Sequence, residues 1–128
     1  MAIAPTPELL VITADRSLPR DIHAVIGKHF KVVPLREPSR ATELLRPRHM
    51  VRAVIVHLND SESTRQLLHT MQRDHASVRR IAIAAPEEFT GIIEGLHSGA
   101  IEHLLHLPLK PRDLITSLGR KETVARGK

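Results

Sequence analysis

The side chains with the greatest capacity for metal chemistry in this chain are its nine histidines. His103 and His106 stand three apart in an apolar run that predicts a strand, so their side chains point to opposite faces. His69 and His75 stand six apart, a spacing that favours no common helical face. The sequence has no HExxH motif, and no spacing singles out one histidine as a pH switch. We therefore expect no metal site.

The sequence also lacks the motifs in which a cysteine or serine acts as a catalytic nucleophile. The chain has no cysteine, which excludes a thiolate nucleophile and a disulfide. No serine lies in a nucleophile elbow. Gly91, Gly95 and Gly99 recur every four residues but follow no strand-like run directly, which favours close helix packing over a phosphate loop. We expect no catalytic residue, no cofactor and no enzymatic activity.

Five short apolar runs are the elements that must position the remaining polar residues. Each is rich in aliphatic or β-branched residues and bounded by turn residues, as in strands buried on both faces. They cover residues 9–14, 30–35, 52–58, 80–85 and 103–107. In the second run, Pro34 is best tolerated near the strand end or at a sheet edge.

Segments with helical spacing follow each of these runs. Ser17, Ser39 and either Asp60 or Ser61 can cap helices, and Pro111 can open the last one. The apolar residues at helical spacing are Ile22, Val25 and Ile26, then Ala41, Leu44 and Leu45, then Leu67, Leu68 and Met71, then Ile92, Ile93 and Leu96, and finally Leu114, Ile115 and Leu118. Gly99 can terminate the fourth helix.

A strand followed by a helix five times over predicts an α/β fold. We expect a flavodoxin-like (βα)5 arrangement, a doubly wound five-stranded parallel sheet of order 2-1-3-4-5 with helices on both faces. In that order the carboxyl ends of strands one, three and four meet at the point where such sheets bind ligands.

Length and composition fit one domain with an aliphatic core. The chain has 128 residues, of which 41% are hydrophobic, with no Trp or Tyr and only Phe30 and Phe89. We expect a flexible leader over residues 1–7, the domain over 8–122, and a tail or linker over 123–128. No apolar run approaches the roughly 18 residues of a membrane span, and the first residues lack a secretory signal. The absence of cysteine is compatible with the cytoplasm.

The net charge of +5 suggests a nucleic-acid partner, but the arrangement of the charges does not. The basic residues are spread over the chain, at Arg16, Arg20, Lys28, Lys31, Arg36, Arg46, Arg48, Arg65, Arg73, Arg79 and Arg80, and are locally dense only from Arg120 to Lys128. Neither interleaved aromatic residues nor a basic recognition helix accompanies them. We expect a solvated basic surface, no direct nucleic-acid binding and no membrane contact.

Three stretches resemble the receiver domain of bacterial response regulators. LLVITADRS is similar to the first strand and its acidic turn, and RAVIVHLND to the third strand ending in the phospho-acceptor. GLHSGAIEHLLHLPLKPRDL is similar to the Gly-Ala, fifth strand and Lys-Pro passage that leads into the last helix. The resemblance covers roughly residues 8–120 and implies the same fold.

Phosphorylation in that family needs two Mg²⁺-binding carboxylates, an acceptor Asp, a Thr or Ser and a Lys. A divalent cation and a lysine must offset the repulsion between the attacking carboxylate and the phosphoryl group. The matching positions here hold Thr13 and Ala14 for the acid pair, His57 for the acceptor, Ala84 for the hydroxyl and Leu107 for the lysine. Asp15 is the only carboxylate near the first of these positions, and a turn or cap role suits it better than a cation site.

The position of the family's lysine depends on the register after the fifth strand. Leu107-Pro108 matches the family's Lys-Pro dipeptide with one extra residue, and Lys110-Pro111 is a rival match that lengthens the loop. We prefer Leu107-Pro108. Even with Lys110 as the lysine, the acceptor Asp and the hydroxyl are absent, so the expectation of a degenerate site stands.

The resemblance therefore implies a pseudo-receiver, a signalling domain that binds a protein partner or itself without phosphorylation. Receivers use the face of helix four, strand five and helix five, which here carries Phe89, Ile92, Glu94, His103, His106, Lys110, Arg112 and Asp113. A C-terminal output domain is expected in the full-length protein. Alternatives are a phospho-acceptor with a displaced site, such as Asp60 or His57, and a sensor that binds a small ligand in the emptied crevice.

Overall fold

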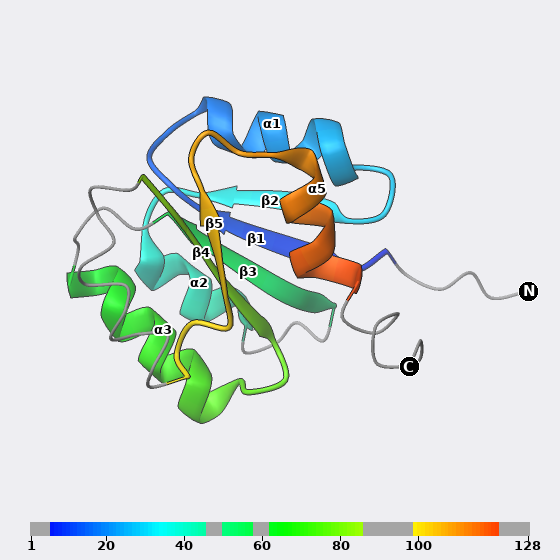
Figure 1. The fold of residues 1–128 in the computed structure, drawn as a ribbon. Helices are drawn as coiled ribbons and strands as arrows, with labels where there is room; N and C mark the ends of the chain where they lie inside the picture. The colour runs from blue at the N-terminus through cyan, green and yellow to red at the C-terminus, as the bar shows by residue number, and fades with distance from the viewer. Residues whose placement is uncertain (1–5, 46–49, 58–61, 86–98, 121–128) are drawn as a thin grey trace, which may run out of the picture.

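A five-stranded parallel β-sheet forms the centre of the molecule (Figure 1). The computed structural model describes residues 6–45, 50–57, 62–85 and 99–120. The strands are β1 Glu8–Ile12, β2 Lys31–Leu35, β3 Val51–His57, β4 Arg79–Ala84 and β5 His103–His106. They lie in the order β2-β1-β3-β4-β5 with every neighbouring pair parallel, which confirms the predicted fold class.

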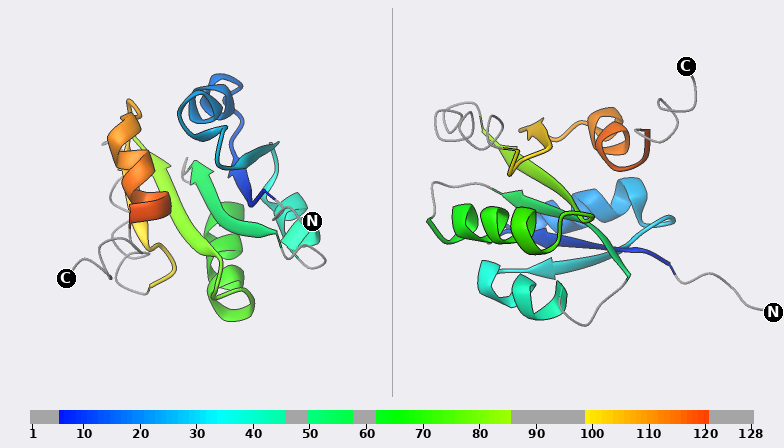
Figure 2. Two further views of the ribbon diagram at one scale, coloured as in Figure 1. Left: turned by 90° about the vertical axis from the view of Figure 1, so that its right-hand side faces the viewer. Right: turned by 90° about the horizontal axis from the view of Figure 1, so that it is seen from below.

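Helices cover both faces of this sheet (Figure 2). They are α1 Ser17–Ile26, α2 Pro38–Leu45, α3 Glu62–Asp74 and α5 Pro111–Ile115, which continues into a π-helical turn, η2, Thr116–Arg120. The helix predicted around Ile92, Ile93 and Leu96 lies outside the described residues, as do the expected caps Asp60 and Ser61. Gly99 has a φ of 86°, a left-handed conformation that glycine adopts without strain.

Two aliphatic cores lie on opposite faces of the sheet. The core on the side of α2 and α3 includes Leu10, Ile12, Val54, Val56, Leu67, Leu68, Met71 and Ala82. The core on the side of α1, α5 and η2 includes Leu9, Val11, Ile22, Ile55, Ile81, Ile83, Leu114 and Leu118. In β1, in β4 and in β3 from Ala53 onward, even and odd residues thus serve different cores. Each fully buried Leu or Ile contributes about 1.5–3 kcal/mol relative to exposure.

The edge position of β2 explains why its strand tolerates a proline. β2 is half-exposed along its length and pairs only with β1 within the described sheet. Pro34 cannot donate to a ladder, so an edge strand is where it fits, as the sequence predicted.

The first strand–helix junction differs from the prediction. β1 ends at Ile12, so Thr13 and Ala14 belong to the connection and not to the strand. Ser17 is the first residue of α1, and the cap position, Arg16, makes no side-chain cap bond. The side chain that bonds the first turn is Asp15, whose Oδ1 accepts the Ser17 amide. The other four strands agree with their predicted ranges to within one residue.

The chain is tied to the sheet from Pro7 onward. The Pro7 carbonyl accepts the Lys31 amide at 2.9 Å, so the last residue of the predicted leader already contacts β2. Residues 1–5 and 121–128 lie outside the described part of the chain. Among the described residues, no helix combines the length and apolar character needed to cross a membrane.

Candidate functional site

The carboxyl ends of β1 and β3 place Thr13 and His57 side by side. Ile12 pairs with Val56 in this parallel ladder, so the next residue on each strand faces the same side of the sheet. Thr13 Oγ1 lies 2.8 Å from His57 Nδ1. Two positions 44 residues apart in the chain thus form one hydrogen-bonded pair, at the edge where open parallel sheets bind ligands.

The threonine hydroxyl binds two protein groups in this arrangement. Its oxygen accepts the Asp15 amide at 3.0 Å, and the Thr13 amide donates to the Leu35 carbonyl at 2.9 Å. A hydroxyl has one proton and two acceptor sites, so it either donates a hydrogen bond to Nδ1 of His57 or accepts one from it. When Nδ1 is the acceptor, protein groups use the proton of the buried Thr13 hydroxyl and one of its acceptor sites.

Asp15 is the one carboxylate near this pair among the described residues of β1 and its connection. Its Oδ1 accepts the Ser17 hydroxyl at 2.8 Å and the Ser17 amide at 2.9 Å. These bonds lower the pKa of Asp15, first through the Ser17 side chain and then through its amide, and attraction to His57 adds a smaller effect in the same direction. The carboxylate is exposed and closes a turn that precedes α1, in agreement with the turn or cap role that the sequence favoured.

The remaining phosphorylation positions do not all converge on His57. Ala84 is buried on the α3 side of the sheet, opposite the face that Thr13 and His57 share. Leu107 directly follows β5, and its amide donates to the Ala84 carbonyl at 3.0 Å. Its half-buried side chain packs with the α1 core, on the same face as His57. Ala14 is exposed in the connection.

Lys110, the rival match for the family's lysine, lies at the start of the last helix. It occupies the N-cap position of α5 and its side chain is exposed, whereas Leu107 stands immediately after the strand. The described residues contain no group of three His, Asp or Glu side chains that could hold a metal ion. Leu104 and Leu105, which stand between His103 and His106, pack into opposite cores. Because side chains alternate along a strand, the two histidines face opposite sides as predicted.

The described part of the expected interaction face lies on β5 and α5. His106, Lys110, Arg112 and Asp113 are exposed, and His103 is half-buried. Phe89, Ile92 and Glu94 lie outside the described residues. Sequence spacing placed Ile115 in the core, yet its exposed fraction is 44%, because Leu114 and Leu118, four residues apart, already occupy the buried stripe. Ile115 therefore adds an apolar group to this surface that the sequence missed.

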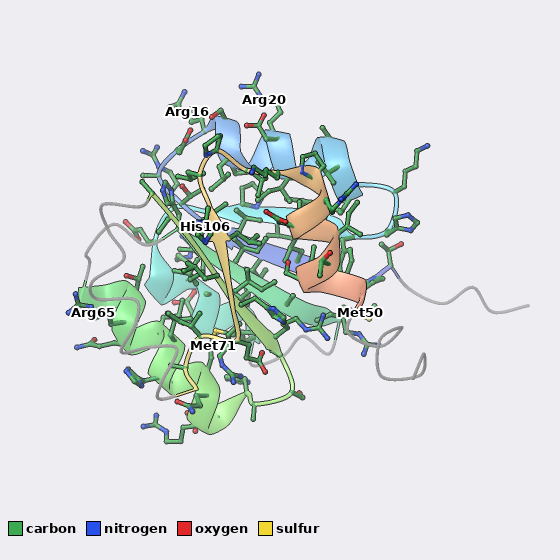
Figure 3. The ribbon with its side chains drawn as sticks, in the orientation of Figure 1. Arg16, Arg20, Met50, Arg65, Met71 and His106 are labelled. Carbon is green, nitrogen blue, oxygen red and sulfur yellow. The ribbon has the colours of Figure 1, made fainter. Side chains whose placement is uncertain are left out.

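The basic residues are spread over separate elements, as predicted from their spacing. Arg16 and Arg20 project from the region of α1 and Arg65 from α3, while His106 lies on β5 (Figure 3). All four side chains are exposed. No single described helix gathers them into one strip that could track a nucleic-acid backbone.

A scan of the sequence against protein-family models gives no match, and a search of curated proteins gives no significant one. Solved structures do match. The signal receiver domain of an HD domain-containing protein from Pseudomonas fluorescens has a TM-score of 0.77 at 19% identity, covering 97% of this chain and 100% of that chain. A response regulator receiver protein from Pseudomonas putida has a TM-score of 0.70 at 17% identity, covering 98% and 100%. A structure named adenylate cyclase, from Rhodopirellula baltica, has a TM-score of 0.77 at 12% identity, covering 96% and 95%.

These likenesses define the class of fold. The chain has the five-stranded, doubly wound fold of response-regulator receiver domains, and the resemblance inferred from its sequence is confirmed at that level.

Proposed function

We propose that this domain is an atypical receiver that acts by binding a protein partner or a second copy of itself, without being phosphorylated. The observation that carries the proposal is the hydrogen bond between Thr13 and His57. By resemblance, these positions belong to a Mg²⁺-binding carboxylate and the phospho-acceptor. Here they bond directly to each other.

The chemistry of these two side chains supports the proposal. A hydroxyl is neutral, and an imidazole is neutral or cationic, so neither supplies the negative charge that a hard divalent cation requires. Without a cation, an attacking carboxylate and a phosphoryl oxygen about 4 Å apart repel each other by about 4 kcal/mol at an effective dielectric constant of 20. The carboxylate of Asp15 is committed to Ser17 and α1.

The surface around α5 supports the binding half of the proposal. Arg112 stands one helical turn before the exposed Ile115, and Lys110 and Asp113 are exposed on the same short segment, which therefore carries both signs of charge. An apolar centre with a charged rim is the usual composition of a protein contact surface. The proposal includes a cytoplasmic signalling role and an output domain fused after this domain, both taken from the resemblance to response regulators.

The test exposes the domain to Mg²⁺ with acetyl phosphate or beryllofluoride and measures its intact mass and its NMR spectrum. We expect neither an adduct nor a site-specific shift. A stoichiometric adduct on Asp60 or His57 would establish the phospho-acceptor alternative instead. A thermal-shift screen against nucleotides and metabolites tests the sensor alternative, which a saturable ligand would support over ours.

A gain-of-function variant makes the test sharper. Thr13→Asp, Ala14→Asp and His57→Asp together restore the carboxylates that the resemblance assigns to these positions. We expect this variant to lose stability in metal-free buffer by like-charge repulsion and to regain roughly 1.4 kcal/mol when Mg²⁺ is tenfold above its dissociation constant. The parent domain should not respond to Mg²⁺ in the same melt. A parent that does respond would contradict the proposal.

A further inference from the structure

Two adjacent arginines stand at the amino end of β4, far from the Thr13–His57 pair. Sequence spacing assigned both to the solvated surface, and the structure corrects this assignment. Arg80 is 5% exposed and Arg79 is half-buried. Because side chains alternate along a strand, Arg80 reaches the α3 face and Arg79 reaches the α5 face.

Arg80 binds the segment that leads into β5. Its Nε donates to the Ala100 carbonyl at 3.1 Å and its Nη2 to the Gly99 carbonyl at 3.2 Å. Glu102 Oε1 accepts the Arg80 backbone amide at 2.9 Å, and Glu102 Oε2 lies 3.7 Å from Nη2. Nη1 donates to Val78 O at 3.2 Å. The buried guanidinium is thus paired and hydrogen-bonded, which is the condition under which a buried charge is tolerated.

Arg79 binds the opposite end of the same unit. Its Nη1 donates to the Ser117 carbonyl at 2.8 Å and to the Leu118 carbonyl at 2.7 Å. These carbonyls lie in the last helical turn, where the helix leaves acceptors unpaired and carries partial negative charge. The buried Ser117 hydroxyl donates to the Leu114 carbonyl at 2.8 Å and tightens the same turn.

We propose that Arg79 and Arg80 form a clamp that positions the β5–α5 unit, residues 99–120, on the sheet. β5 has four residues, lies at the sheet edge and pairs with β4 alone among the described strands (Figure 1). A strand this short gives the unit few ladder bonds. The arginines fix it where it enters the sheet and where its helix ends. Only the role of the β5–α5 unit, which is to present the contact surface, rests on the proposed function.

Hydrogen exchange of the isolated domain tests the clamp without any partner. We expect Arg79→Met to raise exchange at least about tenfold in residues 114–120 while residues 51–57 keep their protection. Arg79→Lys should lie closer to the parent, because one ammonium can donate to both carbonyls that Nη1 binds. Arg80→Met should raise hydrogen exchange in residues 99–106. Arg52→Met, at an exposed position on the neighbouring strand, is the matched control and should change neither segment.

Unchanged exchange in residues 114–120 of Arg79→Met would overturn the proposal, and so would an equal rise throughout the domain, since either result denies a local role. A measurement on the parent protein tests the clamp even if a variant does not fold. Nitrogen-15 NMR should resolve separate, slowly exchanging guanidinium protons for Arg79 and Arg80 and averaged ones for Arg52. Averaged signals for Arg79 and Arg80 would also overturn it.

Partner binding separates the clamp from the proposed function. If exchange shows the clamp but neither a partner nor a dimer is found, the clamp stands and the binding role fails. If a partner binds at α5 with equal affinity to the parent and to Arg79→Met, the binding role stands and the clamp fails as a device that positions the contact surface.

Discussion

The two ends of the sheet differ in how side chains hold the backbone. At the carboxyl edge, Thr13 and His57 join β1 and β3 through one side-chain hydrogen bond that need carry no charge. At the amino edge, Arg79 and Arg80 donate to backbone carbonyls of three separate segments. Hydrogen bonds from charged donors are roughly twice as strong as neutral ones. The fold is therefore anchored at the end where receivers do no phosphoryl chemistry.

Under the proposed function, this contrast favours the β5–α5 unit over the carboxyl edge as the place where a partner binds. Neither Thr13 nor His57 supplies the negative charge that a divalent cation requires. A surface held by Arg79 and the buried Arg80 is pre-organised, which lowers the entropic cost of binding a partner.

The largest effect should come from the amino edge. Arg80→Met removes a buried guanidinium and leaves the Ala100 and Gly99 carbonyls without their donor. We expect a loss of roughly 2–4 kcal/mol in the free energy of unfolding, measured with urea. Arg73→Met is the control, since Arg73 is exposed and its ion pair with Asp74 is screened by solvent, so its loss should change stability far less. Equal losses in the two variants would remove the distinction between the buried and the surface arginine.

A smaller effect should come from the carboxyl edge. Thr13→Val keeps the shape of the side chain but removes the hydroxyl that His57 Nδ1 and the Asp15 amide share. We expect a loss of about 1–2 kcal/mol by urea denaturation, because buried polar groups lose a partner. Thr13→Ser, which retains the hydroxyl, should stay closer to the parent. A Val variant as stable as the parent would mean that the pair contributes nothing to the fold.

The smallest effect should be the acid response of Asp15. Its pKa lies below the ordinary 3.8 because of the Ser17 bonds, so the unfolded chain binds the proton more tightly than the folded one. The contribution of this carboxylate to stability is therefore present above the unfolded pKa and lost as the pH falls through the lower folded value. Urea titrations from pH 6 to pH 2.5 should show a steeper acid decline in the parent than in Asp15→Asn. Parallel curves would contradict this role.

Local patterns in the sequence were sufficient to predict the fold. Dense β-branched runs such as the one ending at His57, separated by turn residues and helical spacing, predict alternating strands and helices. Right-handed crossovers then make the sheet parallel, and the resemblance to receiver domains supplied the order 2-1-3-4-5. The resemblance to receiver domains singled out Thr13 and His57. Their hydrogen bond could not be foreseen, because it depends on the register that sets Ile12 opposite Val56.

The errors occurred where a residue's environment comes from distant parts of the chain. Arg79 and Arg80 have the local sequence of surface charges. Their partners include carbonyls at residues 99–100 and 117–118, about 20 and 38 positions away. A local sequence pattern does not predict such a distant backbone carbonyl as a partner. Ile115 was placed inside for the converse reason, since helical spacing gives the apolar stripe but not which of two adjacent apolar residues meets the sheet.

The sequence by itself determined the alternation of strands and helices and the absence of acidic residues at Thr13, Ala14 and His57, because these are properties of residue type and order. The order of the strands was expected from the resemblance to receiver domains. Only the tertiary structure decided which polar groups meet. It joined Thr13 to His57, put Ala84 on the other face, and buried Arg80 among carbonyls. The reason is physical: the free energy of a polar side chain depends on the partners that folding brings within about 3 Å of it.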